Sequence, residues 1–158
     1  FEDPIELTLS TRSLSDVPEY EALSYVWGIE KCKSPVTVND CSQVITENLD
    51  IALRHLRLKS EPRTLWIDAV CINQEDVAER NYQVSLMGSI YSKASHVVVF
   101  LGPEADKSGF VMDCIASRYA EDSHMPYFIY YANKLAERPW FTRVWVVQEV
   151  ALASEDPV

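Results

Sequence analysis

Apolar and polar positions follow two rhythms along this chain, one typical of strands and one typical of helices. The segment YEALSYVWG, residues 20–28, mixes aromatic and other β-prone residues and stops at a glycine, which predicts a strand that ends there. Residues 35–46 hold two short β-prone runs around Asn39-Asp40, a pattern typical of a hairpin. Three leucines at helical spacing then predict an amphipathic helix: Leu49, Leu53 and Leu56.

Two continuous apolar runs follow in the middle of the chain. The segment TLWIDAVCI, residues 64–72, is apolar on both alternating faces except at Asp68, which predicts a central parallel strand covered by helices on both sides. The segment HVVVFLG, residues 96–102, predicts a shorter buried strand ended by glycine and proline. Between them, Asp76 followed three residues later by Glu79 resembles a capping box and begins a predicted helix over 77–94.

The last third of the chain has a helical pattern interrupted by a polar loop and by Pro139. We predict helices at 110–120, 127–137 and 142–153, with a loop at 121–126. Strands that alternate with helices predict an α/β fold, here a parallel sheet flanked by helices with a small β-hairpin insertion. Ligands of such folds bind at the carboxyl ends of the strands. Three groups of residues lie there: Tyr25, Trp27 and Gly28; Asp68 to Gln74; and Leu101 to Glu104.

The composition fits one ordinary domain. The chain has 158 residues, of which 47% are hydrophobic, enough for a single domain over residues 1–158 with a core of its own. Because it begins at Phe1 rather than Met, we expect a piece of a longer protein. Four cysteines without paired spacing predict reduced thiols and a cytoplasmic protein: Cys32, Cys41, Cys71 and Cys114.

The charge limits the partners. The net charge of −10 repels phosphate backbones and anionic lipid surfaces, so we expect neither nucleic acid nor a membrane as a partner. No apolar run approaches the roughly 20 residues that a membrane-spanning helix needs. The first twenty residues are acidic and polar and do not resemble a signal peptide.

Common catalytic motifs are absent. Four scattered glycines cannot form either nucleotide-binding glycine loop, which argues against a kinase, a P-loop ATPase or an ordinary dehydrogenase. Ser24 lacks the nucleophile-elbow pattern, and Cys71 has no evident partner histidine, so a structural role is favoured for both. The three histidines show no metal-ligand spacing, and we expect no metal: His55, His96 and His124.

Two acidic residues stand in apolar surroundings. Burying Asp68 costs several kcal/mol unless it is paired, and Arg80, Arg138 and Arg143 are possible partners, so structural pairing and a site role both stay open. In RPWFTRVWVVQEV, residues 138–150, we expect Val144, Val147 and Ala151 to face the core of the last helix.

Glu149 then shares a neighbouring face of that helix with Trp145, one turn away. It could bridge to Arg143 or Arg138 as a boundary residue. It could instead be a carboxylate held in a cleft beside an aromatic wall, a setting that raises a pKa and directs the group at a substrate.

Three stretches together resemble the fungal heterokaryon-incompatibility (HET) domain: YEALSYVWG at 20–28, WIDAVCINQEDVAERNYQVSLMGSIYSKASHVVVFLG at 66–102 and RPWFTRVWVVQEVALA at 138–153. They span nearly the whole chain. This resemblance implies a part in the programmed cell death that follows fusion of incompatible fungal cells, usually as one domain of a larger protein.

The HET domain is in turn similar to TIR domains, which have a flavodoxin-like parallel sheet and signal death or innate immunity by self-association. Some TIR domains cleave NAD with a glutamate in a W-C-x-x-E helix motif. The segment WVVQE at 145–149 resembles that motif, with valine in place of cysteine and with the glutamate one position later.

The resemblance implies a catalytic, charge-stabilising role for Glu149 and an apolar wall at Trp145. Further substrate-binding residues would be Trp27, Asp68, Asn73, Tyr25 and Arg143, with NAD as a possible substrate and no cofactor. One stabilising carboxylate suits this reaction, because nicotinamide leaves as a neutral molecule. The alternatives are a non-catalytic, self-associating signalling module with an unknown protein trigger, and a sensor that binds a nucleotide without cleaving it.

Overall fold

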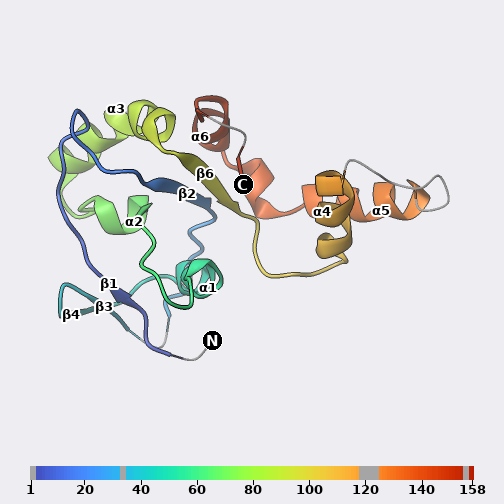
Figure 1. Ribbon diagram of the computed structural model, residues 1–158, viewed down its shortest axis with the longest axis horizontal. Helices are drawn as coiled ribbons and strands as arrows, with labels where there is room; N and C mark the ends of the chain where they lie inside the picture. Colours follow the sequence, from blue (N-terminus) through green and yellow to red (C-terminus); the bar gives the residue numbers. More distant parts are fainter. Residues whose placement is uncertain (1–2, 33–34, 118–124, 155–156) are drawn as a thin grey trace.

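The computed structural model describes residues 3–32, 35–117, 125–154 and 157–158. Within them the chain forms two small sheets, one of which has helices on both faces, and a helical arm (Figure 1). The sheet that positions the site contains β2 (Glu21–Tyr25) between β5 (Leu65–Trp66) and β6 (His96–Phe100), all parallel. Its first strand thus lies between its second and third, the order in which flavodoxin-like sheets begin. The predicted parallel sheet flanked by helices is confirmed.

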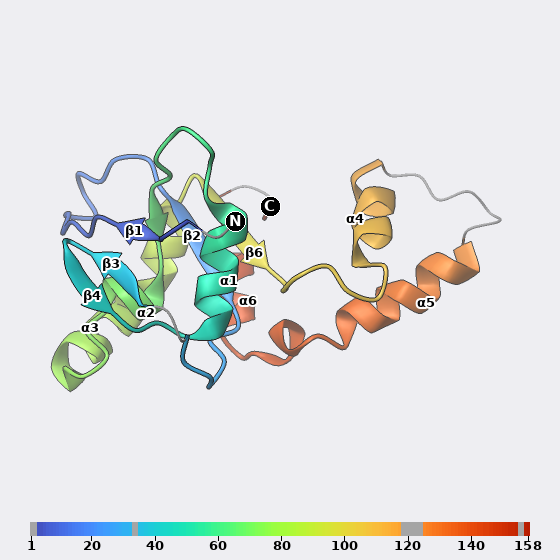
Figure 2. The same cartoon turned by 90° about the horizontal axis from the view of Figure 1, so that it is seen from below.

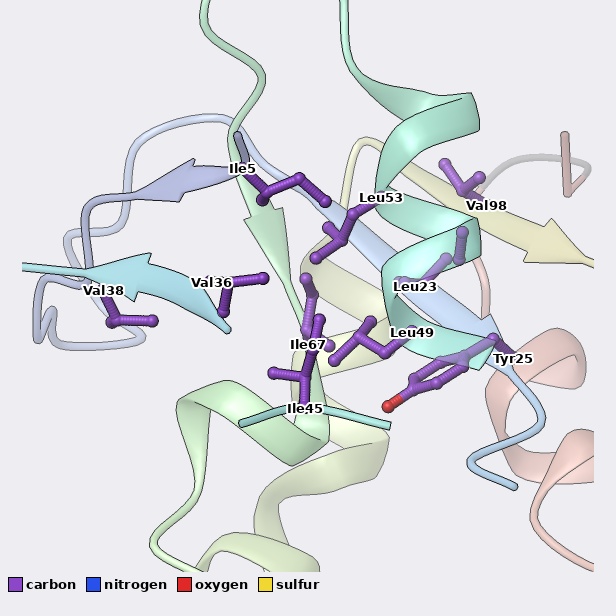
Figure 3. Packing of buried hydrophobic residues seen from close by; sticks show 11 residues of the cluster. Ile5, Leu23, Tyr25, Val36, Val38, Ile45, Leu49, Leu53, Ile67 and Val98 are labelled. Carbon is purple, nitrogen blue, oxygen red and sulfur yellow. The ribbon is translucent and has the colours of Figure 1, made fainter. Parts of the chain in front are cut away.

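Side chains alternate between the two faces of this sheet. On one face, Leu23 and Tyr25 of β2 pack in a core with α1 (Glu47–Leu56), as Figure 3 shows. On the other face, Ala22 packs against residues of α3 (Val77–Lys93), with α6 (Val146–Ala151) beside that helix. The strand therefore divides two cores, and its even-numbered residues face α3 and α6.

The second sheet is built on the predicted hairpin. In it, β3 (Val36–Val38) runs antiparallel to β4 (Cys41–Gln43), and β1 (Glu6–Leu7) pairs with β3 in parallel. Asn39 and Asp40 have φ of 46° and 64°, the left-handed values that a two-residue hairpin turn of this kind requires. The hairpin prediction is confirmed.

The two predicted helices of the middle region are also confirmed. The Oγ1 of Thr46 accepts the amide of Leu49 at the start of α1. Asp76 caps α3 by accepting the amides of Ala78 and Glu79, while the Glu79 carboxylate accepts the amide of Asn73 instead of returning to Asp76. Only the Asp76 half of the expected capping box forms.

The prediction of a central strand over 64–72 is wrong. Strand β5 has two residues, lies at the edge of the sheet, and gives way to the one-turn helix α2 (Asp68–Cys71). Asp68 accepts the amide of Ala69 through its side chain, a local bond that competes with strand pairing. The apolar residues Ala69 and Val70 pack on the α1 core from this helix, which explains an apolar run without a strand.

The predicted helix over 142–153 begins too early. The chain forms a short 3-10 helix, η1 (Pro139–Thr142), and is extended at Arg143, so that α6 begins only at Val146. The expected core residues Val144 and Val147 are 85% and 72% exposed, and Ala151 is exposed as well. Glu149 is buried in their place, because the turn at Arg143 rotates the helix relative to the predicted frame.

Two further helices form an arm. Helices α4 (Ser108–Ser117) and α5 (Met125–Ala136) pack on one another, with Phe110 and Tyr131 in an edge-on ring contact, and extend away from the sheet in both views (Figures 1 and 2). Both helices were predicted. Residues 118–120 of the first predicted helix and residues 121–124 of the predicted loop, with His124, lie outside the described residues. The loop prediction is wrong at 125–126, which already belong to α5. Among the described residues, no helix is both long and apolar enough to cross a membrane.

Candidate functional site

Glu149 is fully buried, with 0% of the residue exposed, and lies at the centre of a polar network. The Arg143 guanidinium meets its carboxylate with two bonds, Nη2 to Oε1 at 2.9 Å and Nη1 to Oε2 at 3.1 Å. The hydroxyl of Ser24 also donates to Oε2. Both carboxylate oxygens are therefore occupied, and the predicted pairing of Glu149 with Arg143 is confirmed.

Ser24 connects this carboxylate to an aromatic residue. It projects from β2 on the face of α3 and α6, and its Oγ accepts the indole N–H of Trp140 at 2.8 Å. Arg143 Nη1 lies 3.5 Å from the same Oγ. We call Ser24, Trp140, Arg143 and Glu149 the Glu149 network. It joins strand β2 to the segment from η1 to α6 across more than 110 positions of sequence.

A buried network of this kind adds little to stability. Removing a carboxylate and a guanidinium from water costs several kcal/mol for each ion, and their attraction offsets that cost only with well-aligned partners. Here the bidentate pair and the Ser24 hydroxyl supply such partners. An apolar contact of similar volume would hold α6 to the sheet as well, so stability alone does not account for these residue types.

A second carboxylate lies at the carboxyl end of the same sheet. Asp68 is 8% exposed, and its Oδ2 accepts the indole N–H of Trp27 at 2.8 Å while its Oδ1 accepts the Ala69 amide at 2.7 Å. We call Trp27 and Asp68 the Asp68 pair. Burial raises the pKa of Asp68, the two donated bonds oppose that shift, and the negative charge of Glu149 adds to it.

Two buried tyrosines lie near the carboxylates: the charge of Asp68 acts on Tyr25, and the charges of both Glu149 and Asp68 act on Tyr91. Tyr91 of α3 donates to the carbonyl of Leu23 at 3.2 Å, and burial together with the charge of Glu149 raises its pKa. Tyr25 is 1% exposed, and its hydroxyl has no hydrogen-bond partner among the described residues. Burial and then the charge of Asp68 raise the pKa of Tyr25. Both phenols are therefore neutral at physiological pH.

The structure brings together five of the seven predicted site residues. Tyr25, Trp27, Asp68, Arg143 and Glu149 are linked by hydrogen bonds or by charge interactions at the carboxyl end of β2. The other two do not join them through their side chains. Asn73 is exposed and bonds within the turn that begins α3. Trp145 stands at the N-cap position of α6, where its carbonyl accepts the Glu149 amide at 3.0 Å, but its side chain makes no cap bond and the residue is 47% exposed. The indole that touches the Ser24 hydroxyl is that of Trp140, and the wall role of Trp145 stays a prediction.

The other two arginines that the sequence offered as partners of Asp68 donate hydrogen bonds to backbone carbonyls. Arg80 donates to the carbonyl of Gln74, and Arg138 donates to those of Leu101 and Ala105. Neither hydrogen-bonds to Asp68, whose two donors are both neutral.

Sequence reasoning missed three residues of this region: Ser24, Trp140 and Tyr91. Ser24 was assigned a structural role because it lacks a nucleophile motif. The available signal was its place on the same face of β2 as Ala22, where a hydroxyl needs a partner once it is buried. Cys71 agrees with its structural interpretation, since burial raises the pKa of its thiol and keeps it protonated. All four cysteines are free.

Glu149 itself is fully enclosed in this conformation, while the Arg143 side chain of its network is 19% exposed. A concavity of about 300 Å³ lies at the opposite, amino ends of the strands, lined by Tyr20, Glu21, Arg63 and neighbouring residues. Ligands of parallel sheets bind at the carboxyl ends of the strands. The Glu149 network and the Asp68 pair are therefore better candidates for a ligand site than this concavity.

Replacing Asp68 with asparagine is expected to stabilise the protein, relative to wild type, more at about pH 8 than at about pH 4. Burial raises the native pKa of Asp68 above its unfolded value, so the wild-type chain loses stability as the pH rises through that native pKa. The variant has no such loss. Urea unfolding of both proteins at both pH values measures the difference. A stability difference that does not change with pH contradicts the assignment of a costly buried charge.

The fold and the site define an α/β domain that holds a buried charged cluster at the carboxyl end of a parallel sheet. Residues 20–149 match the family model of the heterokaryon incompatibility protein (HET), a range that begins just before β2 and ends on Glu149. The chain belongs to this family, as the resemblance predicted. It is 33% identical over 207 aligned positions to heterokaryon incompatibility protein 6, OR allele, of Neurospora crassa.

That alignment covers 98% of this chain and 30% of the Neurospora protein, so the chain spans less than a third of the length of this curated relative. The HET match contains every residue of the Glu149 network and of the Asp68 pair. No solved structure matches the chain.

Proposed function

We propose that this HET domain is an effector of heterokaryon incompatibility that acts by cleaving NAD at the bond between nicotinamide and ribose. The observation that carries the proposal is the position of Glu149. It is a fully buried carboxylate at the ligand-binding end of a parallel sheet. A second buried carboxylate, Asp68, lies close enough for the charge of Glu149 to raise its pKa. Ionisable groups buried at this kind of location are candidates for chemistry, because they are costly as structural elements.

The reaction needs little from the protein. The bond between C1′ of the ribose and the ring nitrogen breaks, and its electron pair neutralises the positive charge of that nitrogen, so nicotinamide leaves without a proton. The ribose carbon becomes an oxocarbenium-like centre, and water adds its oxygen there and releases a proton. A carboxylate fixed beside C1′ stabilises the developing positive charge, which is the role we propose for Glu149.

The described conformation is a resting one in this account. Both oxygens of Glu149 are occupied by Arg143 and Ser24, so substrate reaches the carboxylate only after Arg143 moves away. The Arg143 side chain is 19% exposed, and it can reach water by changing its rotamer. Once active, the domain removes NAD from the cell that contains it, and the loss of NAD kills that cell.

The test of this proposal is nicotinamide release from NAD by the purified wild-type chain, followed by chromatography over a range of protein concentrations. We expect release to rise more steeply than the protein concentration, because the resemblance to TIR domains implies self-association of the catalytic domain. The absence of release at every concentration, from protein whose fold is verified by circular dichroism, contradicts the enzymatic proposal.

A non-catalytic, self-associating module is the second candidate, and one observation favours it. Large apolar side chains are exposed together on the segment from η1 to α6, with Val144 at 85%, Val147 at 72% and Trp145 at 47%. Exposed apolar patches commonly mark protein contacts. In that case Glu149 only holds the segment in place, and light scattering detects oligomers that turn over no NAD.

A further inference from the structure

The charge of Asp68 is not balanced by a cation of its own. Its two hydrogen-bond donors, the indole of Trp27 and the amide of Ala69, are both neutral. Arg143 is near enough to affect Asp68, but both of its terminal nitrogens bind Glu149. Two carboxylates thus share one guanidinium within the part of the chain that the structure describes. The Asp68 carboxylate, beside Trp27, is therefore the one that has no cation bonded to it.

An indole lies beside this carboxylate and contacts it through its N–H edge. The Trp27 side chain is 38% exposed, and the bond from its Nε1 to Asp68 fixes the orientation of the indole. The loop after it is also fixed. Gly28 has a φ of 71°, and the side chain of Asn48 lies where a Cβ on Gly28 would be, while Asn48 Nδ2 donates to the carbonyl of Val26 at 3.1 Å. The indole is therefore held in place before any ligand arrives.

A buried hydroxyl without a partner lies close to the same carboxylate. Tyr25 is 1% exposed, and Asp68 is the charge that acts on it most strongly. Figure 3 shows its hydroxyl oxygen on the side of Leu49 and Ile45, among the core side chains. Buried hydroxyls in proteins nearly always have a partner, and the Tyr25 hydroxyl has none among the described residues.

We propose that Trp27 and Asp68 form a subsite for a cationic aromatic ring, specifically an N-alkylated pyridinium. An aromatic face combined with a carboxylate attracts a planar cation through both the ring and the charge. A neutral ring of the same shape gains only the stacking, and an anion is repelled. The choice of a pyridinium among planar cations rests on the proposed function, because the nicotinamide ring of NAD is one.

This subsite distinguishes substrate from product. The ring carries a positive charge before cleavage and none after it, so the attraction to Asp68 ends with the reaction and nicotinamide is released. Asp68 binds the ground-state cation while Glu149 stabilises the charge that moves to the ribose. Replacing Asp68 with asparagine therefore raises KM for NAD and does not lower kcat, whereas replacing Glu149 lowers kcat.

The experiment compares 1-methylnicotinamide with nicotinamide, two rings that differ in charge and in one methyl group. Calorimetric titration of the wild-type chain should show binding of the cation about tenfold tighter than binding of the neutral ring, the ratio that a cation–aromatic contact with a partly buried charge provides. In Asp68→Asn and in Trp27→Leu the preference should fall to about one. Asp76→Asn is the matched control, because it removes the same charge at a helix cap where asparagine serves equally well.

Equal binding of the two rings by the wild-type chain overturns the subsite, as does a preference that persists in both Asp68→Asn and Trp27→Leu. The outcome is separable from the proposed function. A chain that prefers the cation but releases no nicotinamide from NAD supports the subsite and contradicts NAD cleavage. A chain that releases nicotinamide without any preference contradicts the subsite alone. If one variant does not fold, the other variant and the wild-type comparison decide.

Discussion

Replacing Arg143 with alanine is expected to lower the free energy of unfolding by about 3–5 kcal/mol, the usual cost of removing one partner of a buried ion pair. The reason is the burial of Glu149, which has an exposure of 0% and receives two of its three hydrogen bonds from Arg143. Without the guanidinium, the buried carboxylate has neither a counter-charge nor contact with water. Urea denaturation followed by tryptophan fluorescence measures the loss.

Two variants make this result specific. Arg80→Ala removes an arginine that is exposed and donates to one backbone carbonyl, so we expect it to change stability by less than about 1 kcal/mol. Adding Glu149→Gln to Arg143→Ala removes the stranded charge and should restore part of the loss. A loss below about 1 kcal/mol for Arg143→Ala, or no recovery in the double variant, contradicts the account of the Glu149 network.

Replacing Glu149 with glutamine is expected to abolish toxicity while the domain stays folded. Removing one group that stabilises transition-state charge typically lowers kcat by a factor of about 100 or more. The fold tolerates the change better than it tolerates Arg143→Ala, because glutamine still accepts from Arg143 and the guanidinium, 19% exposed, reaches water. The measurement is cellular NAD and colony formation after induced expression in yeast. Wild-type protein should deplete NAD, and Glu149→Gln should leave it at the uninduced level.

The matched control is Glu137→Gln. Glu137 is exposed and pairs with Lys134 on the arm, so the same chemical change there should leave NAD depletion intact. Equal depletion by wild type and Glu149→Gln, at equal protein levels, contradicts a catalytic role for Glu149. Loss of depletion in both glutamine variants indicates an effect of expression or folding rather than of the site.

Elements with strong local signals could be predicted from the sequence. The hairpin at Asn39 and Asp40, the leucine stripe of α1 and the Asp76 cap of α3 each depend on residues a few positions apart. The short strand β6 was recognisable because its apolar run is bounded by glycine and proline. These signals reflect turn geometry, helical periodicity and capping, which act within one segment of the chain.

Two segments were misjudged because apolar content does not determine backbone conformation. At 64–72 the same residues form two strand positions and a helical turn, since the carboxylate of Asp68 bonds to the next amide. At 142–153 the extended backbone of Arg143 shifts the start of the helix, which turns Val147 outward and Glu149 inward. Periodicity groups residues on the faces of a helix, but the packing of the folded chain decides which face meets the core.

The candidate site was predictable in part. The rule that ligands bind at the carboxyl ends of parallel strands selected Tyr25, Trp27 and Asp68, and the isolated charges in an apolar stretch selected Arg143 and Glu149. Ser24 and Glu149 are 125 positions apart, and no spacing pattern connects residues at that distance. Their contact depends on which face of β2 meets α6, and only the folded chain fixes that.

The central claim is that the Glu149 network is a reaction centre, and nicotinamide release by purified wild type, Glu149→Gln and Glu137→Gln tests it most directly. Each protein is incubated with NAD at matched concentration after its fold is verified, and the products are separated by chromatography. The account predicts release by wild type and Glu137→Gln, with a loss of about 100-fold or more in Glu149→Gln. Equal release by all three proteins, or release by none, contradicts it.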